Sequence, residues 1–246
     1  MNRELKDRLI AYLVILYIGI TSAFFFVIAF FIWLFTLPFD KNKKILHLFT
    51  CFWACFYLWT LPVWKARAID RHKIDKNKVY VIVANHQSHL DIVVAFLLFC
   101  HFKWISKAEV FRLPFIGWNM RLNDYVKLKR GDKKSIEEMF KKCEELIAKG
   151  NSIFIFPEGT RSHDGKLQKF KPGAFILAKK MKVPILPVVI NGTRAALPKY
   201  TLKFHGVHEF TIKVLDEIPY EKFKDMKVEE ISEMVRNIML PHIQEC

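Results

Sequence analysis

Residues 85–91 hold the side chains of this chain best suited to chemistry, a histidine and a carboxylate separated by four residues. His86 can take up a proton near neutral pH, because an unperturbed histidine has a pKa of about 6.5. Asp91 can orient that imidazole and stabilise its protonated form. The spacing therefore indicates proton-transfer chemistry, with His86 as the general base and Asp91 as its orienting acid.

Three other interpretations of the same segment compete with this one. Ser88 followed three residues later by Asp91 is a capping-box pattern, which predicts a helix that begins near His89. His86, His89 and Asp91 are also possible metal ligands, although no second cluster completes a zinc-like set. Ser88 could serve as a nucleophile, but the chain has no Gly-x-Ser-x-Gly turn to present it. A capped helix is compatible with proton transfer, since its first turn can hold a carboxylate beside the preceding histidine.

The elements that must position these residues are visible as short apolar runs. Residues 79–84 are apolar and β-branched, as expected of a strand that is covered on both faces. Further runs occupy residues 125–128, 152–156 and 185–190. Polar segments follow the four runs: Asn85-His86, Lys129-Arg130-Gly131, Pro157 to Ser162, and Asn191-Gly192-Thr193. If the strands are mostly parallel, these segments meet at one edge of the sheet and line one pocket.

Amphipathic segments alternate with these runs and predict helices. Residues 135–149 carry one apolar stripe, with Ser135 and Glu138 as a capping box and Gly150 as the stop. Residues 174–181 and 228–239 predict two more helices. Alternating strands and helices predict an α/β domain over residues 65–246, with a mostly parallel central sheet flanked by helices.

Residues 1–64 are expected to form a separate hydrophobic unit. Residues 9–37 and 45–64 carry no charge, and each is long enough to cross a bilayer core, which takes roughly 20 apolar residues. We therefore expect a two-helix membrane anchor. Basic residues lie before, between and after the two stretches, and such clusters tend to stay on the cytoplasmic side. This favours a helical hairpin that enters and leaves from one face over two full spans.

The positive net charge of the chain indicates which classes of molecule it could bind. The chain has a formal net charge of +15, of which residues 1–64 contribute +3 and the remainder +12. A basic domain beside a membrane anchor favours anionic lipid headgroups or phosphorylated substrates. Nucleic acid is disfavoured, because no nucleic-acid motif accompanies the charge. The five scattered cysteines include no Cys-x-x-Cys pair, which favours reduced thiols in a cytosol-facing protein.

Four sequence blocks, in order, carry a family resemblance. They are Asn85-His86-x4-Asp91, Phe111-x-x-Pro114-x-x-Gly117-Trp118 running on to Arg130, Phe156-Pro157-Glu158-Gly159-Thr160-Arg161, and Val183-Pro184-Ile185-Leu186-Pro187-Val188. Together they cover about residues 78–195. In these blocks the chain resembles the glycerolipid acyltransferase family, and most closely the bacterial 1-acyl-sn-glycerol-3-phosphate acyltransferases of the PlsC type. Two hydrophobic helices ahead of the domain also fit that family.

The resemblance implies transfer of a fatty acyl group from a thioester to the sn-2 hydroxyl of lysophosphatidic acid, which gives phosphatidic acid. His86 would be the general base and Asp91 its orienting partner. The acyl-acceptor site would include Arg130, Glu158, Gly159, Thr160 and Arg161, to which we add Lys107 on charge and position. No metal, cofactor or covalent acyl-enzyme is expected, and acyl-CoA or acyl carrier protein would serve as the co-substrate.

The implied location is the inner cell membrane, with the catalytic domain on its cytoplasmic face. Three alternatives remain open at this point. One is an acyltransferase that acts on another lysophospholipid or on a glycerol-phosphate acceptor. A second is a membrane-bound metal-dependent hydrolase that uses His86, His89 and Asp91 as ligands. The third is a non-catalytic module that binds anionic lipid through its basic surface.

Overall fold

A seven-stranded sheet forms the centre of the molecule. The computed structural model describes residues 3–162, 164–197 and 207–244, with side chains from residue 9 onward. The strands of this part are β1 (Trp64–Ile69), β2 (Val81–Ala84), β3 (Phe102–Lys107), β4 (Val126–Leu128), β5 (Ser152–Ile155), β6 (Ile185–Asn191) and β7 (His208–Val214). They are ordered β1-β7-β6-β2-β5-β3-β4 across the sheet.

All four predicted strands are present, as β2, β4, β5 and β6, and they run parallel to one another together with β3. Their carboxyl ends therefore lie on one edge of the sheet, as expected. β7 pairs antiparallel with β6 and parallel with β1, so this pair runs the opposite way. The sequence pattern did not predict β1, β3 or β7. β1 carries exposed Lys65 and Arg67, which interrupt the apolar run that marked the other strands.

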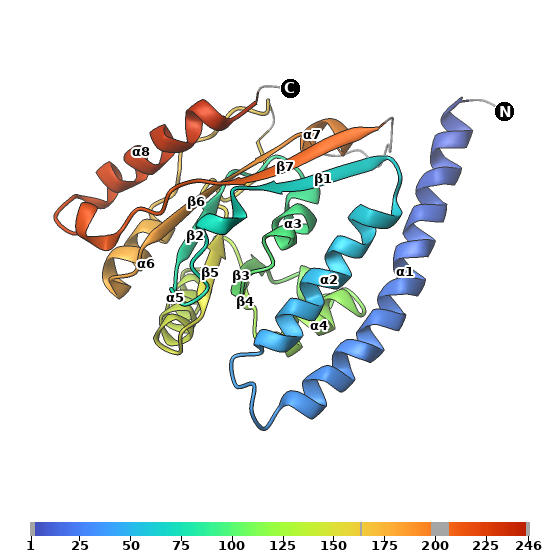
Figure 1. Ribbon diagram of the computed structural model, residues 1–246, viewed down its shortest axis with the longest axis horizontal. Helices are drawn as coiled ribbons and strands as arrows, with labels where there is room; N and C mark the ends of the chain where they lie inside the picture. The colour runs from blue at the N-terminus through green and yellow to red at the C-terminus, as the bar shows by residue number, and fades with distance from the viewer. Residues whose placement is uncertain (1–2, 163, 198–206, 245–246) are drawn as a thin grey trace.

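Helices cover both faces of the sheet (Figure 1). They are α1 (Arg3–Thr36), α2 (Lys44–Thr60), α3 (Leu90–Ala95), α4 (Ile116–Leu122), α5 (Lys133–Ala148), α6 (Gly173–Met181), α7 (Thr193–Ala196) and α8 (Val228–Met239). α5, α6 and α8 bury one apolar cluster on one face. α2 and α3 bury a second cluster on the other face. The strands between these two cores are shielded on both sides, which accounts for their continuous apolar sequences.

The start of α5 corrects the predicted capping box. The N-cap residue is Asp132, and its carboxylate accepts the backbone N–H of Ser135 at 3.1 Å. Ser135 lies inside the helix, and its hydroxyl accepts the backbone N–H of Lys129 at 2.9 Å. Both Asp and Ser are favoured cap residues, and the chain offers Asp first. The helix therefore begins earlier than the apolar stripe indicated.

The hairpin of α1 and α2 is present, but its two helices differ. Among the described helices, only α1 is long and apolar enough to cross a membrane, with an apolar stretch at Leu9–Thr36. α2 has 17 residues, fewer than the roughly 20 that a bilayer crossing usually takes, and one side of it is buried against α3 and β1. The expectation that both stretches qualify by length is therefore wrong for α2. Its apolar residues pack into the core, where Cys51 and Cys55 are fully buried.

Polar contacts fix the turn of the hairpin to the body of the protein. Asn42 in that turn donates from its side chain to the carbonyl of Lys149 at the end of α5, at 2.8 Å. The ammonium of Lys103, a residue that is 1% exposed, donates to the carbonyls of Asn42 and Asn123 at 2.7 and 2.8 Å. Midway along α1, Phe26 packs on Trp118 of α4 with ring centroids 5.4 Å apart. The hairpin therefore lies alongside the domain and does not project from it.

Candidate active site

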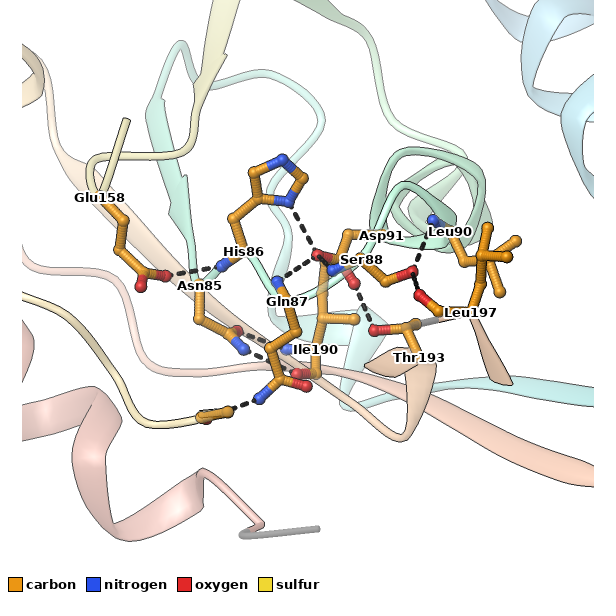
Figure 2. A network of polar contacts seen from close by, with 11 residues as sticks. Asn85, His86, Gln87, Ser88, Leu90, Asp91, Glu158, Ile190, Thr193 and Leu197 are labelled. Carbon is orange, nitrogen blue, oxygen red and sulfur yellow. Dashed lines mark hydrogen bonds and ion pairs between the residues drawn. The ribbon is translucent and has the colours of Figure 1, made fainter. Parts of the chain in front are cut away.

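His86 and Asp91 form a hydrogen-bonded pair just beyond the end of β2 (Figure 2). The His86 Nδ1 atom lies 2.8 Å from Asp91 Oδ2. A carboxylate oxygen can only accept, so Nδ1 must carry the proton and Nε2 keeps its lone pair. Among the described residues, no group hydrogen-bonds to Nε2. The arrangement leaves His86 ready to act as a base, with its tautomer fixed by Asp91.

The carboxylate of Asp91 is held by its surroundings. The side chain is 0% exposed, and its Oδ2 atom also accepts the backbone N–H groups of Gln87 and Ser88 at 2.6 and 2.8 Å. Its Oδ1 atom accepts the hydroxyl of Thr193. These donors compensate the burial of a charged group. Asp91 therefore both closes the turn before α3, as the capping pattern suggested, and orients His86.

The side chains of Ser88 and His89 do not contact the His86–Asp91 pair through a hydrogen bond in the described structure. The Ser88 hydroxyl donates to the carbonyl of Leu197 at 2.8 Å and accepts the N–H of Leu90 at 3.3 Å, so it is a capping group turned away from His86. His89 is exposed. Desolvation of its ring, followed by the charge of Arg161, lowers the pKa of His89. Within the described ranges, no three His, Cys, Asp or Glu side chains gather as metal ligands would.

Phe156 supports the face of the His86 ring. The two rings are stacked, with centroids 4.1 Å apart and planes 12° from parallel. Phe156 stacks in turn on Trp104, at 5.5 Å. The imidazole is thus confined at its edge by Asp91 and on its face by Phe156. Sequence reasoning gave Phe156 no role, although its position directly after the β5 core marked it as an aromatic residue at the functional edge.

Glu158 ties the His86 loop to the segment after β5. Its two carboxylate oxygens accept the backbone N–H groups of His86 and Gln168, at 2.6 and 3.0 Å (Figure 2 draws the first). The residue is 4% exposed, and burial raises its pKa to about 7 against the opposing effect of these two N–H donors. The resemblance implied acceptor binding by Glu158. In this structure both oxygens accept backbone N–H groups of the site, and acceptor binding by Glu158 stays a prediction.

The predicted cations are arranged around the same edge without forming one contact cluster. Arg161 is partly buried, close enough to influence His89. Lys107 ends β3 and lies 3.6 Å from Glu109, with about half of each side chain exposed. Arg130 follows β4 and is exposed, as is Thr160.

Gly159 has a requirement of its own. Its φ is +71°, and a Cβ atom placed on it would lie 2.8 Å from the Nζ atom of Lys171. The glycine therefore permits both the left-handed backbone and the approach of the lysine. Nothing in the sequence pattern marked Lys171 as a site residue. The structure adds it as a further cation beside the loop of residues 158–161.

Comparison with known proteins shows to which family the chain belongs. The family model described as Acyltransferase matches residues 65–191. A 1-acyl-sn-glycerol-3-phosphate acyltransferase of Chlamydomonas reinhardtii is 36% identical over 209 residues, which cover 84% of this chain and 62% of the relative. A chloroplastic enzyme of the same name from Arabidopsis thaliana is 38% identical over 197 residues, covering 79% of this chain and 55% of the relative. The chain thus spans less than two thirds of the length of these curated relatives.

One solved structure shares the fold over nearly the full length. The 1-acyl-sn-glycerophosphate acyltransferase PlsC of Thermotoga maritima matches with a TM-score of 0.77 and 24% identity, covering 98% of this chain and 96% of that one. This match confirms the predicted α/β fold with its mostly parallel sheet. The residues matched by the family model include His86, Asp91 and the segment from Phe156 to Arg161. The chain therefore belongs to the acyltransferase family.

Proposed function

We propose that the protein transfers a fatty acyl group from a thioester to the sn-2 hydroxyl of lysophosphatidic acid. The observation that carries this proposal is the His86–Asp91 pair in a chain of the acyltransferase family. Its Nδ1 is held at 2.8 Å from the carboxylate, and its Nε2 has no hydrogen-bond partner in the part of the chain that the structure describes. The names of the relatives supply the acceptor, since they describe 1-acyl-sn-glycerol-3-phosphate acyltransferases.

The pair can perform both proton transfers of that reaction. His86 Nε2 takes the proton of the acceptor hydroxyl as its oxygen attacks the thioester carbonyl, and Asp91 stabilises the imidazolium that forms. The tetrahedral intermediate then collapses and breaks the carbon–sulfur bond. The imidazolium returns its proton to the departing thiolate, so His86 ends the cycle neutral. An ester and a free thiol are the products, and no step requires a covalent acyl-enzyme or a metal.

The acceptor phosphate needs cationic partners. Arg161 is the first candidate, because its guanidinium has the planar set of donors that suits a phosphate group. Arg161 also lies three residues after Glu158, whose carboxylate accepts the backbone N–H of His86. Lys171 beside Gly159 and Lys107 at the end of β3 can add charge from neighbouring segments. Arg130 would approach from the edge strand. We assign these residues to headgroup binding, and acyl-CoA or acyl carrier protein to the role of donor.

The apolar hairpin supports a membrane location. α1 exposes large apolar side chains along most of its length. α4 adds exposed Ile116 and Trp118 beside it, and Leu113 is exposed just before α4. Because the α1–α2 turn is hydrogen-bonded to the domain, a spanning α1 would draw the domain into the hydrocarbon. We therefore propose that the hairpin lies in one leaflet, on the cytoplasmic face of the cell membrane.

Cysteine labelling from one side of sealed proteoliposomes tests this topology. In a variant without Cys246, Lys41→Cys in the hairpin turn and Lys222→Cys on the domain should react equally with an impermeant maleimide, since the described native cysteines are buried. Labelling of the two positions from opposite sides would show that the hairpin spans the bilayer.

The reaction itself is tested by product analysis. The purified protein would receive lysophosphatidic acid, glycerol 3-phosphate or lysophosphatidylcholine, each with acyl-CoA and with acyl carrier protein thioester. The proposal expects phosphatidic acid as the main product, with one donor preferred. Turnover confined to another acceptor would replace lysophosphatidic acid as the substrate. Chelator-sensitive hydrolysis with no acyl transfer would overturn the proposal.

A further inference from the structure

Thr193 lies where β6 turns back toward the His86–Asp91 pair. β6 ends at Asn191, and Gly192 follows with a φ of +86°. A Cβ atom on Gly192 would lie 2.0 Å from the carbonyl oxygen of Glu209, so only glycine fits this tight turn. The turn directs Thr193 at α3, where the side chain is 0% exposed and its hydroxyl donates to Asp91 Oδ1 (Figure 2).

Side-chain hydrogen bonds fix the turn on both sides. Asn85 donates to the carbonyl of Ile190 at 2.7 Å and accepts the N–H of Ile190 at 2.8 Å, so its amide continues the pairing of β2 with β6. Ser88 donates to Leu197 at the end of α7. The residues on either side of Thr193 are thus joined to the segment that carries His86. A hydroxyl held in this way has a fixed direction.

The two oxygens of Asp91 are not equally supported. Oδ2 accepts three donors, one of them His86. Among the described residues, Thr193 is the one donor to Oδ1. Without that hydroxyl, a fully buried carboxylate oxygen has no partner, which is costly for a charged group. The carboxylate can then rotate to share its other donors, and the His86 ring follows it.

We propose that Thr193 is a positioning residue for the acyl transfer, because it sets the orientation of Asp91 and thereby of His86. The inference rests on the proposed function for its kinetic consequences. Thr193 acts through Asp91 and does not touch the reacting atoms. Its role would not be found by reading the chain locally, since Thr193 and Asp91 are 102 positions apart in the sequence.

Thr193→Val and Thr193→Ser separate the hydroxyl from the shape of the side chain. Valine keeps the volume and removes the donor, whereas serine keeps the donor. The matched control is Thr50→Val, which removes a buried hydroxyl that bonds the carbonyl of Leu46 within α2 and accepts from Asn119 and Asn123. Steady-state kinetics with lysophosphatidic acid and an acyl thioester would be measured from about pH 5 to pH 9.

For Thr193→Val we expect kcat to fall roughly ten- to a hundredfold, the range that corresponds to one hydrogen bond to a charged group. KM should stay unchanged, and Thr193→Ser should recover kcat to within about threefold. The acidic limb of the pH profile should move to higher pH, because an Asp91 that has lost a donor holds the imidazolium more strongly. Thr50→Val should keep the wild-type kcat and pH profile.

Two results would overturn the inference. One is a wild-type kcat in Thr193→Val; the other is an equal loss in the valine and serine variants with an unmoved pH profile, which would mean packing alone. A measurement without turnover separates this inference from the proposed function. In 15N-histidine NMR, with His86 assigned by His86→Ala, Thr193→Val should change the tautomer signal and titration of His86. Unchanged signals would refute the positioning role even if lysophosphatidic acid were not the substrate.

Discussion

Replacing Glu158 by Gln should make the protein more stable and less active. Glu158 is 4% exposed, and burial raises its pKa to about 7 from an ordinary value of 4.5. Glutamine has the shape of the protonated carboxyl group and cannot ionise. The substitution therefore removes a buried charge. The carboxylate of Glu158 accepts the backbone N–H groups of both His86 and Gln168, whereas the single carbonyl oxygen of glutamine can accept only one of them at its present position.

The size of the stability effect follows from the pKa. A tenfold change in an acid dissociation constant corresponds to about 1.36 kcal/mol, so a rise in pKa from 4.5 to about 7 costs the folded state about 3 kcal/mol once Glu158 is ionised. Because the folded pKa is raised, the contribution of this group is fully present below pH 4.5 and is lost as the pH rises through 7. Relative to the wild type, the stability of Glu158→Gln should therefore rise by about 3 kcal/mol between about pH 4.5 and about pH 8.

Denaturant unfolding in detergent, followed by tryptophan fluorescence at several pH values, measures this difference. The control is Glu144→Gln, which removes a carboxylate that pairs with Lys180 on the surface.

The same substitution should lower activity. The kcat of Glu158→Gln should fall roughly tenfold, because one of the two hydrogen bonds that fix the loops of the site is lost. A variant less stable than the wild type at pH 8 would mean that the two N–H donors outweigh the desolvation of the carboxylate. Full activity would mean that Glu158 does not hold the site.

Substitutions at two further positions, Phe156 and Arg161, separate support of the His86 ring from binding of the acceptor headgroup. Phe156→Leu removes the ring stacked on His86, so we expect kcat to fall roughly tenfold with KM unchanged, whereas Phe156→Tyr should retain activity in the same steady-state assay. An equal loss in both variants would point to general damage. Arg161→Lys keeps the charge but loses the planar fork, and it should raise KM for lysophosphatidic acid roughly tenfold with little change in kcat. An unchanged KM would remove Arg161 from the acceptor site.

The central strands of the sheet could be predicted from the sequence. The apolar run before His86 and the runs before Lys129, Pro157 and Asn191 became β2, β4, β5 and β6, because a strand buried on both faces has to be apolar throughout. β1 and β7 lie at the edge of the sheet opposite β4. Both strands mix apolar with charged residues, so their sequences resemble those of loops. Their pairing depends on partners that lie far away in the chain.

The site was predictable only in part for the same reason. His86 and Asp91 are five residues apart, and the turn that joins them is local. Thr193, Phe156 and Lys171 come from other segments, and nothing in their immediate sequence indicates which side chain they meet. Glu158 was noticed for its charge, but its hydrogen bonds to two backbone N–H groups appear only once the loops are folded together. The sequence therefore predicted the candidate base, and the fold showed which residues hold it in place.

The kcat of His86→Ala tests the central claim most directly. The variant would be compared with the wild type and with Asp91→Asn, using lysophosphatidic acid and an acyl thioester, after circular dichroism shows that each is folded. General base catalysis contributes roughly a hundred- to ten-thousandfold, so His86→Ala should lose at least about a hundredfold in kcat, and Asp91→Asn should also fall. Turnover by His86→Ala at the wild-type rate would contradict the assignment of His86 as the base.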